Sequence, residues 1–220
     1  MTSTVRLTPP TSCSGSDPVT KPTQSSLLIV HATLDVKGWI ARPPSPEAAR
    51  PGQCPRCGAA SRPTGAGLGL HGHGLRDRAI FGPPDADADP ERMWVRCRRY
   101  LCVVGACGAV ILVVPRGVAP RRHYSLAAIA MAMTLWGILE LPPAHVRERI
   151  CVSPSVLWGT EWSTLRRWAR AARALVDLPV VITLREVATR VAQIAIGRAP
   201  PTLRTAPLVA QAFAGGTAGS

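Results

Sequence analysis

Two cysteines separated by two residues form the clearest chemical motif of the chain, in the sequence Cys54-Pro-Arg-Cys57-Gly58. This spacing places two thiolates on one tight turn. The glycine that follows can adopt a positive φ, which lets backbone N–H groups approach the sulfur atoms. Because such a pair is typical of zinc sites, we predict that Cys54 and Cys57 bind a metal ion.

A tetrahedral zinc ion needs two further ligands, and the candidates are Cys97, Cys102, Cys107, His71 and His73. If residues 94–102 form one strand, side-chain alternation places Cys97 and Cys102 on opposite faces, so only one of them can face the metal. Cys102 is the better candidate because it lies next to the turn expected at residues 103–106. Cys107-Gly108 then repeats the Cys-Gly ending of the first pair.

The sequence therefore predicts one structural zinc ion held by Cys54, Cys57, Cys102 and Cys107, with C-x4-C spacing in place of the usual C-x2-C in the second pair. Two alternatives stay open: Cys97, His71 or His73 replaces Cys102, or the cysteines are buried and free of metal. A closed site of four cysteines leaves no position for a water molecule, which argues against zinc catalysis.

A strongly amphipathic basic helix is predicted from about Trp162 to Val176. Its apolar face carries Trp162, Leu165, Trp168, Ala169, Ala172 and Val176, and its opposite face carries Ser163, Arg166, Arg167, Arg170 and Arg173. A helix anchored by one face, with an arginine stripe on the other, suits the phosphate backbone and the major groove of DNA. The alternative is that these arginines only solvate an outer face.

The charge of the whole chain also favours a polyanionic partner. The net charge is +13 over 220 residues, and the pI is about 10.9. Nucleic acid is the commonest partner of such a protein. Because nearly all the positive charge is arginine, and Ala and Pro are abundant, GC-rich coding is a second explanation of the same profile.

Reduced cysteines and a cytoplasmic location are expected. The cysteine count of seven is odd, and the first 25 residues lack the apolar core of a secretory signal. The apolar runs at residues 101–114 and 126–139 are shorter than the roughly 18–20 residues of a membrane-spanning helix. No membrane association is therefore expected.

The pattern along the chain predicts an α+β fold, with a small β zinc ribbon followed by a helical bundle of helix-turn-helix type and disordered termini. Ser125 is expected to cap a central buried helix, and Pro143 to open a short helix that ends near Ile150. Thr183 and Glu186 have the spacing of a capping box for the last helix. The expected segments are a disordered tail (1–25), a short strand and proline-rich linker (26–52), the zinc ribbon (53–118), the helical domain (119–198) and a flexible tail (199–220).

No enzyme is expected, and no catalytic residue is assigned. The chain has no G-x-S-x-G, no P-loop and no H-E-x-x-H motif. Asp85, Asp87 and Asp89 lie in a proline-rich loop, where carboxylates are poorly held for catalysis. The run Gly65-Ala-Gly67-Leu-Gly69 is interpreted as a flexible segment only.

The motifs CPRCG, HGHGLRDR, RRYLC, VVPRGVAPRRHYSLAAIA and STLRRWARAAR together resemble a group of small bacterial zinc-ribbon and helix-turn-helix proteins. These are uncharacterised or transposase-related proteins of mobile elements, and the resemblance covers roughly residues 50–215. It implies a zinc ribbon and a homeodomain-like DNA-binding region that uses Arg166, Arg167 and Arg170. A complete transposase core does not fit in this chain, so the implied role is an accessory or truncated one.

The sequence therefore leaves two alternative functions. The first is a zinc-stabilised DNA-binding protein, associated with a mobile element or with regulation. The second is a zinc-ribbon protein–protein adaptor without direct nucleic-acid contact. A homo-oligomer, or a protein partner from transposition or regulation, is compatible with either function.

Overall fold

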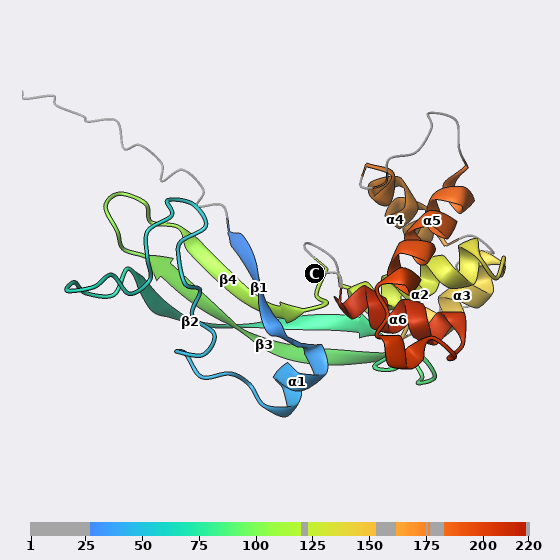
Figure 1. Ribbon diagram of the computed structural model, residues 1–220, viewed down its shortest axis with the longest axis horizontal. Coiled ribbons are helices and arrows are strands. Elements are labelled where there is room, and N and C mark those ends of the chain that lie inside the picture. Colours follow the sequence, from blue (N-terminus) through green and yellow to red (C-terminus); the bar gives the residue numbers. More distant parts are fainter. Residues whose placement is uncertain (1–26, 120–122, 153–161, 175, 177–182, 219–220) are drawn as a thin grey trace, which may run out of the picture.

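A four-stranded sheet forms one end of the molecule and a group of helices forms the other (Figure 1). The computed structural model describes residues 27–119, 123–152, 162–174, 176 and 183–218. The predicted α+β class is confirmed. The tail predicted at residues 1–25 lies outside the described residues, and none of the helices within them is long and apolar enough to cross a membrane.

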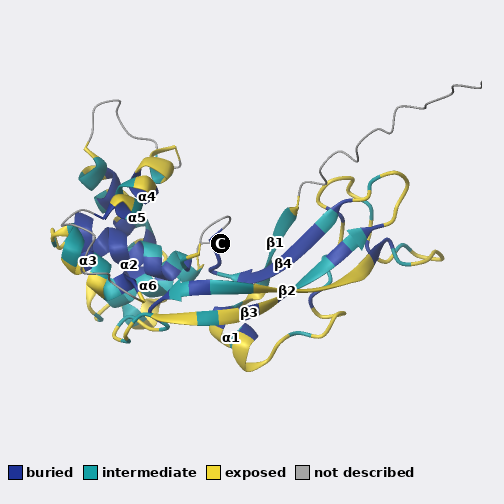
Figure 2. Cartoon of the chain, turned by 180° about the vertical axis from the view of Figure 1, so that it is seen from behind, coloured by how far each residue is buried: buried dark blue, intermediate teal, exposed yellow. Residues whose placement is uncertain are grey.

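The sheet contains β1 (Leu28–Asp35), β2 (Leu70–Gly82), β3 (Glu91–Cys102) and β4 (Val110–Arg116), in the order β1-β4-β3-β2. The last three strands pair antiparallel, as consecutive strands joined by short loops do, whereas β1 pairs parallel with β4. As a central strand with almost only apolar residues, β4 is buried along most of its length (Figure 2).

The proline-rich segment expected to be a linker packs on the sheet instead of connecting two separate parts. β1 leads into the short helix α1 (Val36–Ala41), which Asp35 caps by accepting a hydrogen bond from the Gly38 N–H group at 2.8 Å. Beyond α1, the backbone carbonyl groups of Pro44 and Pro46 accept hydrogen bonds from Arg98 and Tyr100 of β3. Residues 27–52 therefore belong to the same structural unit as the sheet formed by residues 70–116.

Among the described residues, five α-helices form the other end. In chain order they are α2 (Leu126–Gly137), α3 (Pro143–Ile150), α4 (Ser163–Arg173), α5 (Leu184–Gly197) and α6 (Leu208–Ala218), and the short 3-10 helix η1 (Pro201–Leu203) precedes α6. The predicted caps are confirmed: the Ser125 side chain accepts from the Ala128 N–H group, and Thr183 and Glu186 form the capping box. α2 is buried on nearly every side, as predicted from its uniformly apolar sequence (Figure 2).

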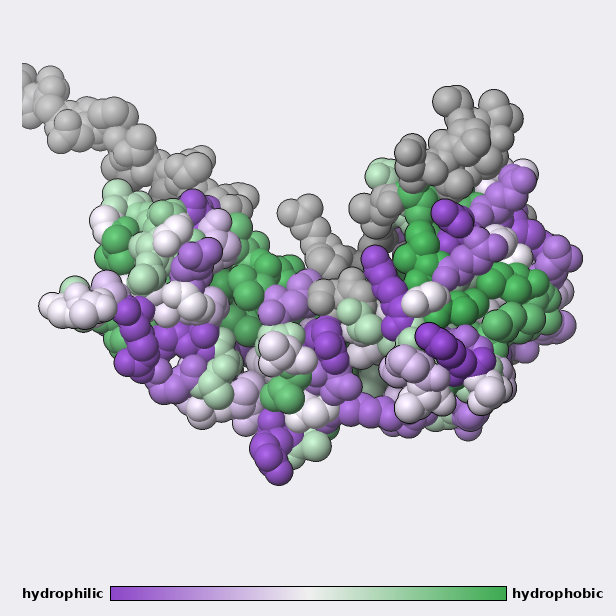
Figure 3. Space-filling view, viewed as in Figure 1, coloured by the Kyte–Doolittle hydropathy of each residue, from purple (hydrophilic) through white to green (hydrophobic). Residues whose placement is uncertain are grey.

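Each end of the molecule has its own apolar core. One core lies around the sheet, and the other lies between α2, α3, α4 and α5. In the space-filling view, hydrophobic residues gather over both of these ends (Figure 3). The two halves can therefore be perturbed by different substitutions.

The prediction of a flexible tail over residues 199–220 is wrong for residues 201–218, which form η1 and α6. α6 packs against α2 and α5. A Cβ atom at Gly215 would lie 1.7 Å from the backbone oxygen of Ala195, and one at Gly216 would lie 2.8 Å from the backbone oxygen of Leu126. The small residues that suggested fraying instead allow the helix backbones to approach closely.

We expect Gly215→Ala to lower the free energy of unfolding by about 1–3 kcal/mol, because the added methyl group forces α6 away from α5. Gly197→Ala is the matched control, since a Cβ atom there would meet nothing within 4 Å. Urea denaturation of the two variants gives the comparison. Equal midpoints would show that α6 does not pack as described.

Candidate metal centre and basic helix

The first cysteine pair lies in a tight hairpin that begins at Gly52. The Cys54 N–H group donates to the oxygen of Ala59 at 2.8 Å, and the Gly58 N–H group donates to the oxygen of Cys54 at 2.9 Å. Gly58 has a φ of 71°, a left-handed conformation that glycine adopts at little energetic cost. The turn therefore depends on the Cys-Gly sequence that defined the motif.

The second cysteine pair lies in the hairpin between β3 and β4. Cys102 is the last residue of β3, and its N–H group donates to the oxygen of Ala109 at 2.9 Å. The N–H group of Cys107 donates to the oxygen of Val104 at 3.3 Å. Gly105 and Gly108 have φ values of 55° and 56°. The left-handed Gly105 thus helps the turn to accommodate the longer C-x4-C spacing, and Gly108 follows the second pair as Gly58 follows the first.

The structure brings together the four cysteines selected from the sequence. The sulfur atoms of Cys54, Cys57, Cys102 and Cys107 all lie within 4.8 Å of one another. The distance between the Cys54 and Cys107 sulfur atoms is 3.9 Å, and that between Cys57 and Cys102 is 3.7 Å. A tetrahedron with metal–sulfur bonds of about 2.3 Å has sulfur–sulfur edges of about 3.8 Å, so this cluster is compatible with a metal site.

Backbone N–H groups also point at these sulfur atoms. Burial acts to raise the pKa of Cys54, but hydrogen bonds from the N–H groups of Cys57 and Arg56 outweigh it and lower that pKa to about 7. Burial raises the pKa of Cys102 to about 12, even though the Val104 N–H group donates to its sulfur. Because metal ions bind thiolates, loading of the cluster must release protons.

The alternative ligands do not join this cluster. Cys97 is buried, and its thiol donates to the Val95 oxygen at 3.8 Å. Burial raises the pKa of Cys97 to about 11, although the charge of Arg78 opposes the shift. His71 and His73 are exposed, and the His71 ring lies 3.1 Å from the Leu68 oxygen. The prediction from alternation along β3 is therefore confirmed: Cys102, and not Cys97, lies with the first cysteine pair.

Gly69, which was interpreted only as part of a flexible run, joins the two cysteine hairpins. Its N–H group donates to the oxygen of Ser61 at 2.9 Å, and its own oxygen accepts from the N–H group of Val103 at 3.0 Å. A Cβ atom at Gly69 would lie 2.4 Å from the oxygen of Ala60. No local sequence signal marks this role, because the partners lie at least eight residues away.

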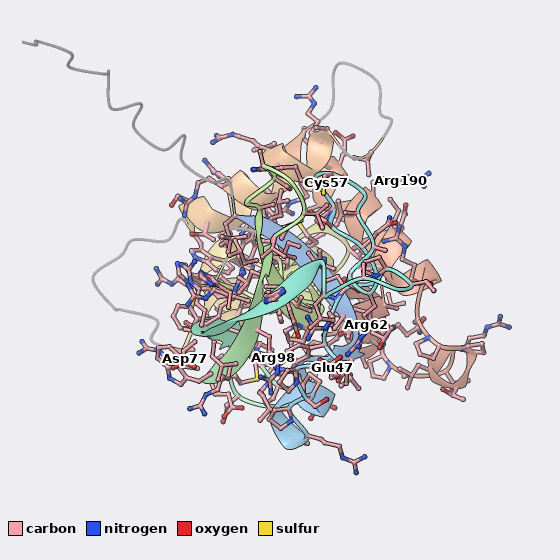
Figure 4. All side chains as sticks on the ribbon, turned by 90° about the vertical axis from the view of Figure 1, so that its left-hand side faces the viewer. Glu47, Cys57, Arg62, Asp77, Arg98 and Arg190 are labelled. Carbon is pink, nitrogen blue, oxygen red and sulfur yellow. The ribbon has the colours of Figure 1, made fainter. Side chains whose placement is uncertain are left out.

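Charged side chains from the proline-rich segment add a second connection to the first hairpin. Glu47 pairs with Arg50 and with Arg62, and Figure 4 shows Glu47 and Arg62 close together. Hydrogen bonds from Arg50, and then from Arg62, lower the pKa of Glu47 to about 2. The Arg50 guanidinium also donates to the Leu70 oxygen and lies 5.4 Å from the centre of the Tyr100 ring. The i,i+3 spacing of Glu47 and Arg50 was the only local signal of this network.

The basic helix α4 has the two faces that the sequence predicts, but it ends at Arg173 and not near Val176. Trp162, just before the helix, and Leu165, Trp168 and Ala169 within it are buried. Trp162 and Trp168 lie edge to face at 5.1 Å between ring centres, and Tyr124 packs edge to face on both of them. Of the proposed DNA-binding residues, Ser163, Arg167, Arg170 and Arg173 are exposed and Arg166 is half-buried.

Comparison with known protein families, curated proteins and solved structures finds no match to this chain. The resemblance to zinc-ribbon and helix-turn-helix proteins of mobile elements therefore stays a prediction. What can be inferred about function comes from the cysteine cluster and from the exposed face of α4.

The arrangement of α3 and α4 bears on the helix-turn-helix prediction. α3 ends at Ile150 and α4 begins at Ser163, which is a longer connection than the three or four residues of the standard motif. α4 packs mainly against α5, whereas both α3 and α4 contribute to the core around α2. Any DNA contact would therefore depend on α4 and its support from α2 and α5, rather than on a compact pair of consecutive helices.

Proposed function

We propose that Cys54, Cys57, Cys102 and Cys107 bind one zinc ion and that this ion is structural. Four thiolates are soft ligands that suit zinc, and their separations match a tetrahedral sphere. With four protein ligands, the ion would have no open position for a substrate or water. Its role would be to fix the first cysteine hairpin to the end of the β3–β4 hairpin.

We further propose that the protein binds DNA through α4. The observation that carries this proposal is the exposure of Arg167, Arg170 and Arg173 on a helix whose other face is held by buried aromatic rings. A rigid anchor lets the arginines contact phosphates with little additional loss of conformational freedom. The net charge of +13 favours the same partner. The resemblance described above adds a mobile-element or regulatory setting, with an accessory or truncated transposase-like role.

Zinc and DNA would act at different places. β3 ends and β4 begins at the end of the sheet remote from the helices (Figure 1), and the cysteine cluster lies there. Zinc would therefore stabilise the sheet half without touching DNA bound at α4. A loss of DNA binding after substitution of α4 arginines should leave the zinc content unchanged.

The test compares duplex DNA binding by the wild type and by a variant in which Arg166, Arg167, Arg170 and Arg173 are all alanine. We expect the variant to bind much more weakly, and its affinity to depend less on salt, since each lost phosphate contact lowers the slope by about one unit. The single change Arg167→Ala should lower the slope by about one unit. Fluorescence anisotropy over a series of salt concentrations measures both quantities.

A second variant with alanine at Arg42, Arg190, Arg198 and Arg204 is the matched control, because it removes the same charge from exposed positions outside α4. It should retain most of the affinity of the wild type. Equal binding by the α4 variant and the wild type would contradict the proposal and favour a protein–protein adaptor. Equal losses in both variants would mean that the total charge, rather than α4, determines binding.

A further inference from the structure

Trp94 is an exposed tryptophan in the middle of a strand. Its exposed fraction is 60%, whereas Trp39, Trp136, Trp162 and Trp168 are exposed by 1%, 6%, 8% and 4%. An indole ring combines a large apolar surface with a polar N–H group, and tryptophan is enriched where proteins contact other molecules. Trp94 is therefore the described aromatic side chain with the most surface left for a ligand.

The two neighbours of Trp94 along β3 on the same face are cationic. Arg92 and Arg96 lie two residues away on either side, so alternation directs their side chains to the face of Trp94. The Arg96 side chain is 68% exposed and lies 3.5 Å from the Asp77 carboxylate. The Arg92 guanidinium lies 5.2 Å from the centre of the Phe81 ring. These contacts hold each arginine against the β2 residue opposite it, one on either side of Trp94 along the strand.

The residue opposite Trp94 leaves space around the ring. The cross-strand partner of Trp94 in β2 is Ala79, whose small side chain covers little of the indole. A hollow of about 480 Å³ borders Trp94 and the segment of β2 from Arg76 to Ala79. His123 and the apolar side chains of Ile29 and Leu112 also line this hollow. The site thus combines an aromatic surface with positive charge and a recess beside it.

We propose that Trp94 is a stacking platform for an unpaired base of a single-stranded nucleic acid, with Arg92 and Arg96 contacting the flanking phosphates. Bases in a duplex stack on each other, so an exposed indole can stack only on a base that is unpaired. Base–aromatic stacking combined with a cationic surface along the backbone is the common way in which proteins bind single strands. This surface is separate from α4, so it does not depend on the duplex-binding proposal.

The test measures the affinity of the 220-residue chain, purified under reducing conditions with zinc present, for a fluorescein-labelled oligonucleotide of thymidines. The oligonucleotide is about 20 nucleotides long, since such sites cover several nucleotides. We expect Trp94→Ala to weaken binding by about ten-fold or more, and Trp94→Phe to restore part of that loss because phenylalanine can still stack. Arg96→Ala should weaken binding and reduce its salt dependence, whereas Arg42→Ala should not. Leu34→Ala is the apolar control, at a side chain that is 41% exposed on β1.

The proposal would be overturned if Trp94→Ala bound the oligonucleotide as tightly as the wild type. It would also be overturned if Trp94→Ala and Trp94→Phe lost the same amount of affinity. If the wild type bound duplex DNA but not the thymidine oligonucleotide, this inference would fail while the α4 proposal stood. If the protein bound the oligonucleotide in a way that depends on Trp94 but did not bind duplex DNA, this inference would stand and the α4 proposal would fail. A change of oligomeric state in Trp94→Ala, with unchanged oligonucleotide affinity, would identify a self-association surface and overturn the proposal.

Discussion

Replacement of Cys54 or Cys57 with serine is expected to abolish zinc binding and to unfold the sheet end of the molecule around the cysteine cluster. A serine hydroxyl stays protonated at neutral pH and is a poor zinc ligand, so the closed site loses one of its four bonds. Structural zinc binding contributes about 10–16 kcal/mol in small zinc-finger peptides at neutral pH. That energy is comparable to the whole stability of an ordinary domain, which is about 5–15 kcal/mol.

Metal analysis of the purified protein gives the first measurement. The wild type should contain about one zinc per chain, and the Cys54→Ser and Cys57→Ser variants should contain none. Cys102→Ser should also release zinc, because the Cys102 sulfur lies 3.7 Å from that of Cys57. Cys97→Ser is the matched control: it changes a buried thiol outside the cluster and should retain the metal.

Two results would contradict the zinc proposal. One is a wild-type protein free of zinc after purification under reducing conditions. The other is stoichiometric zinc in the Cys54→Ser variant. Zinc retained by Cys102→Ser and lost from Cys97→Ser would show instead that the β3 register is wrong.

Trp168→Ala should lower the free energy of unfolding of the helical half by about 3–5 kcal/mol, the usual effect of removing a buried aromatic side chain. Trp168 is 4% exposed, and its ring centre lies 5.0 Å from that of Tyr124 and 5.1 Å from that of Trp162. Each such aromatic contact adds about 0.5–1.5 kcal/mol beyond the buried area. Its removal leaves a cavity beneath α4.

Chemical denaturation followed by far-UV circular dichroism measures this effect. Trp94→Ala provides the control, since the same change at an exposed position should alter stability by no more than about 0.5 kcal/mol. Zinc content should be unchanged in both variants because the cysteine cluster lies in the other core. Similar stabilities of Trp168→Ala and Trp94→Ala would contradict the packing described for α4.

Local chemistry along the chain was sufficient to predict many of the elements and the composition of the cysteine cluster. Ser125 and Thr183 act on N–H groups only three residues away, so their caps can be read from short patterns. Strand alternation separated Cys102 from Cys97, because the two thiols lie an odd number of residues apart. The faces of α4 follow in the same way from helical periodicity.

Other features depend on contacts between distant segments, and only the tertiary structure decided them. The backbone of Gly69 forms hydrogen bonds with both Ser61 and Val103. The parallel pairing of β1 with β4 joins segments about 80 residues apart in the chain. The Ala- and Gly-rich sequence of α6 is compatible both with fraying and with close helix packing. Which of the two occurs depends on whether another part of the fold offers a complementary surface to α6. Here α2 and α5 provide that surface. Caps, alternation and periodicity act over a few residues, whereas burial of α6 depends on surfaces that the folded chain brings together.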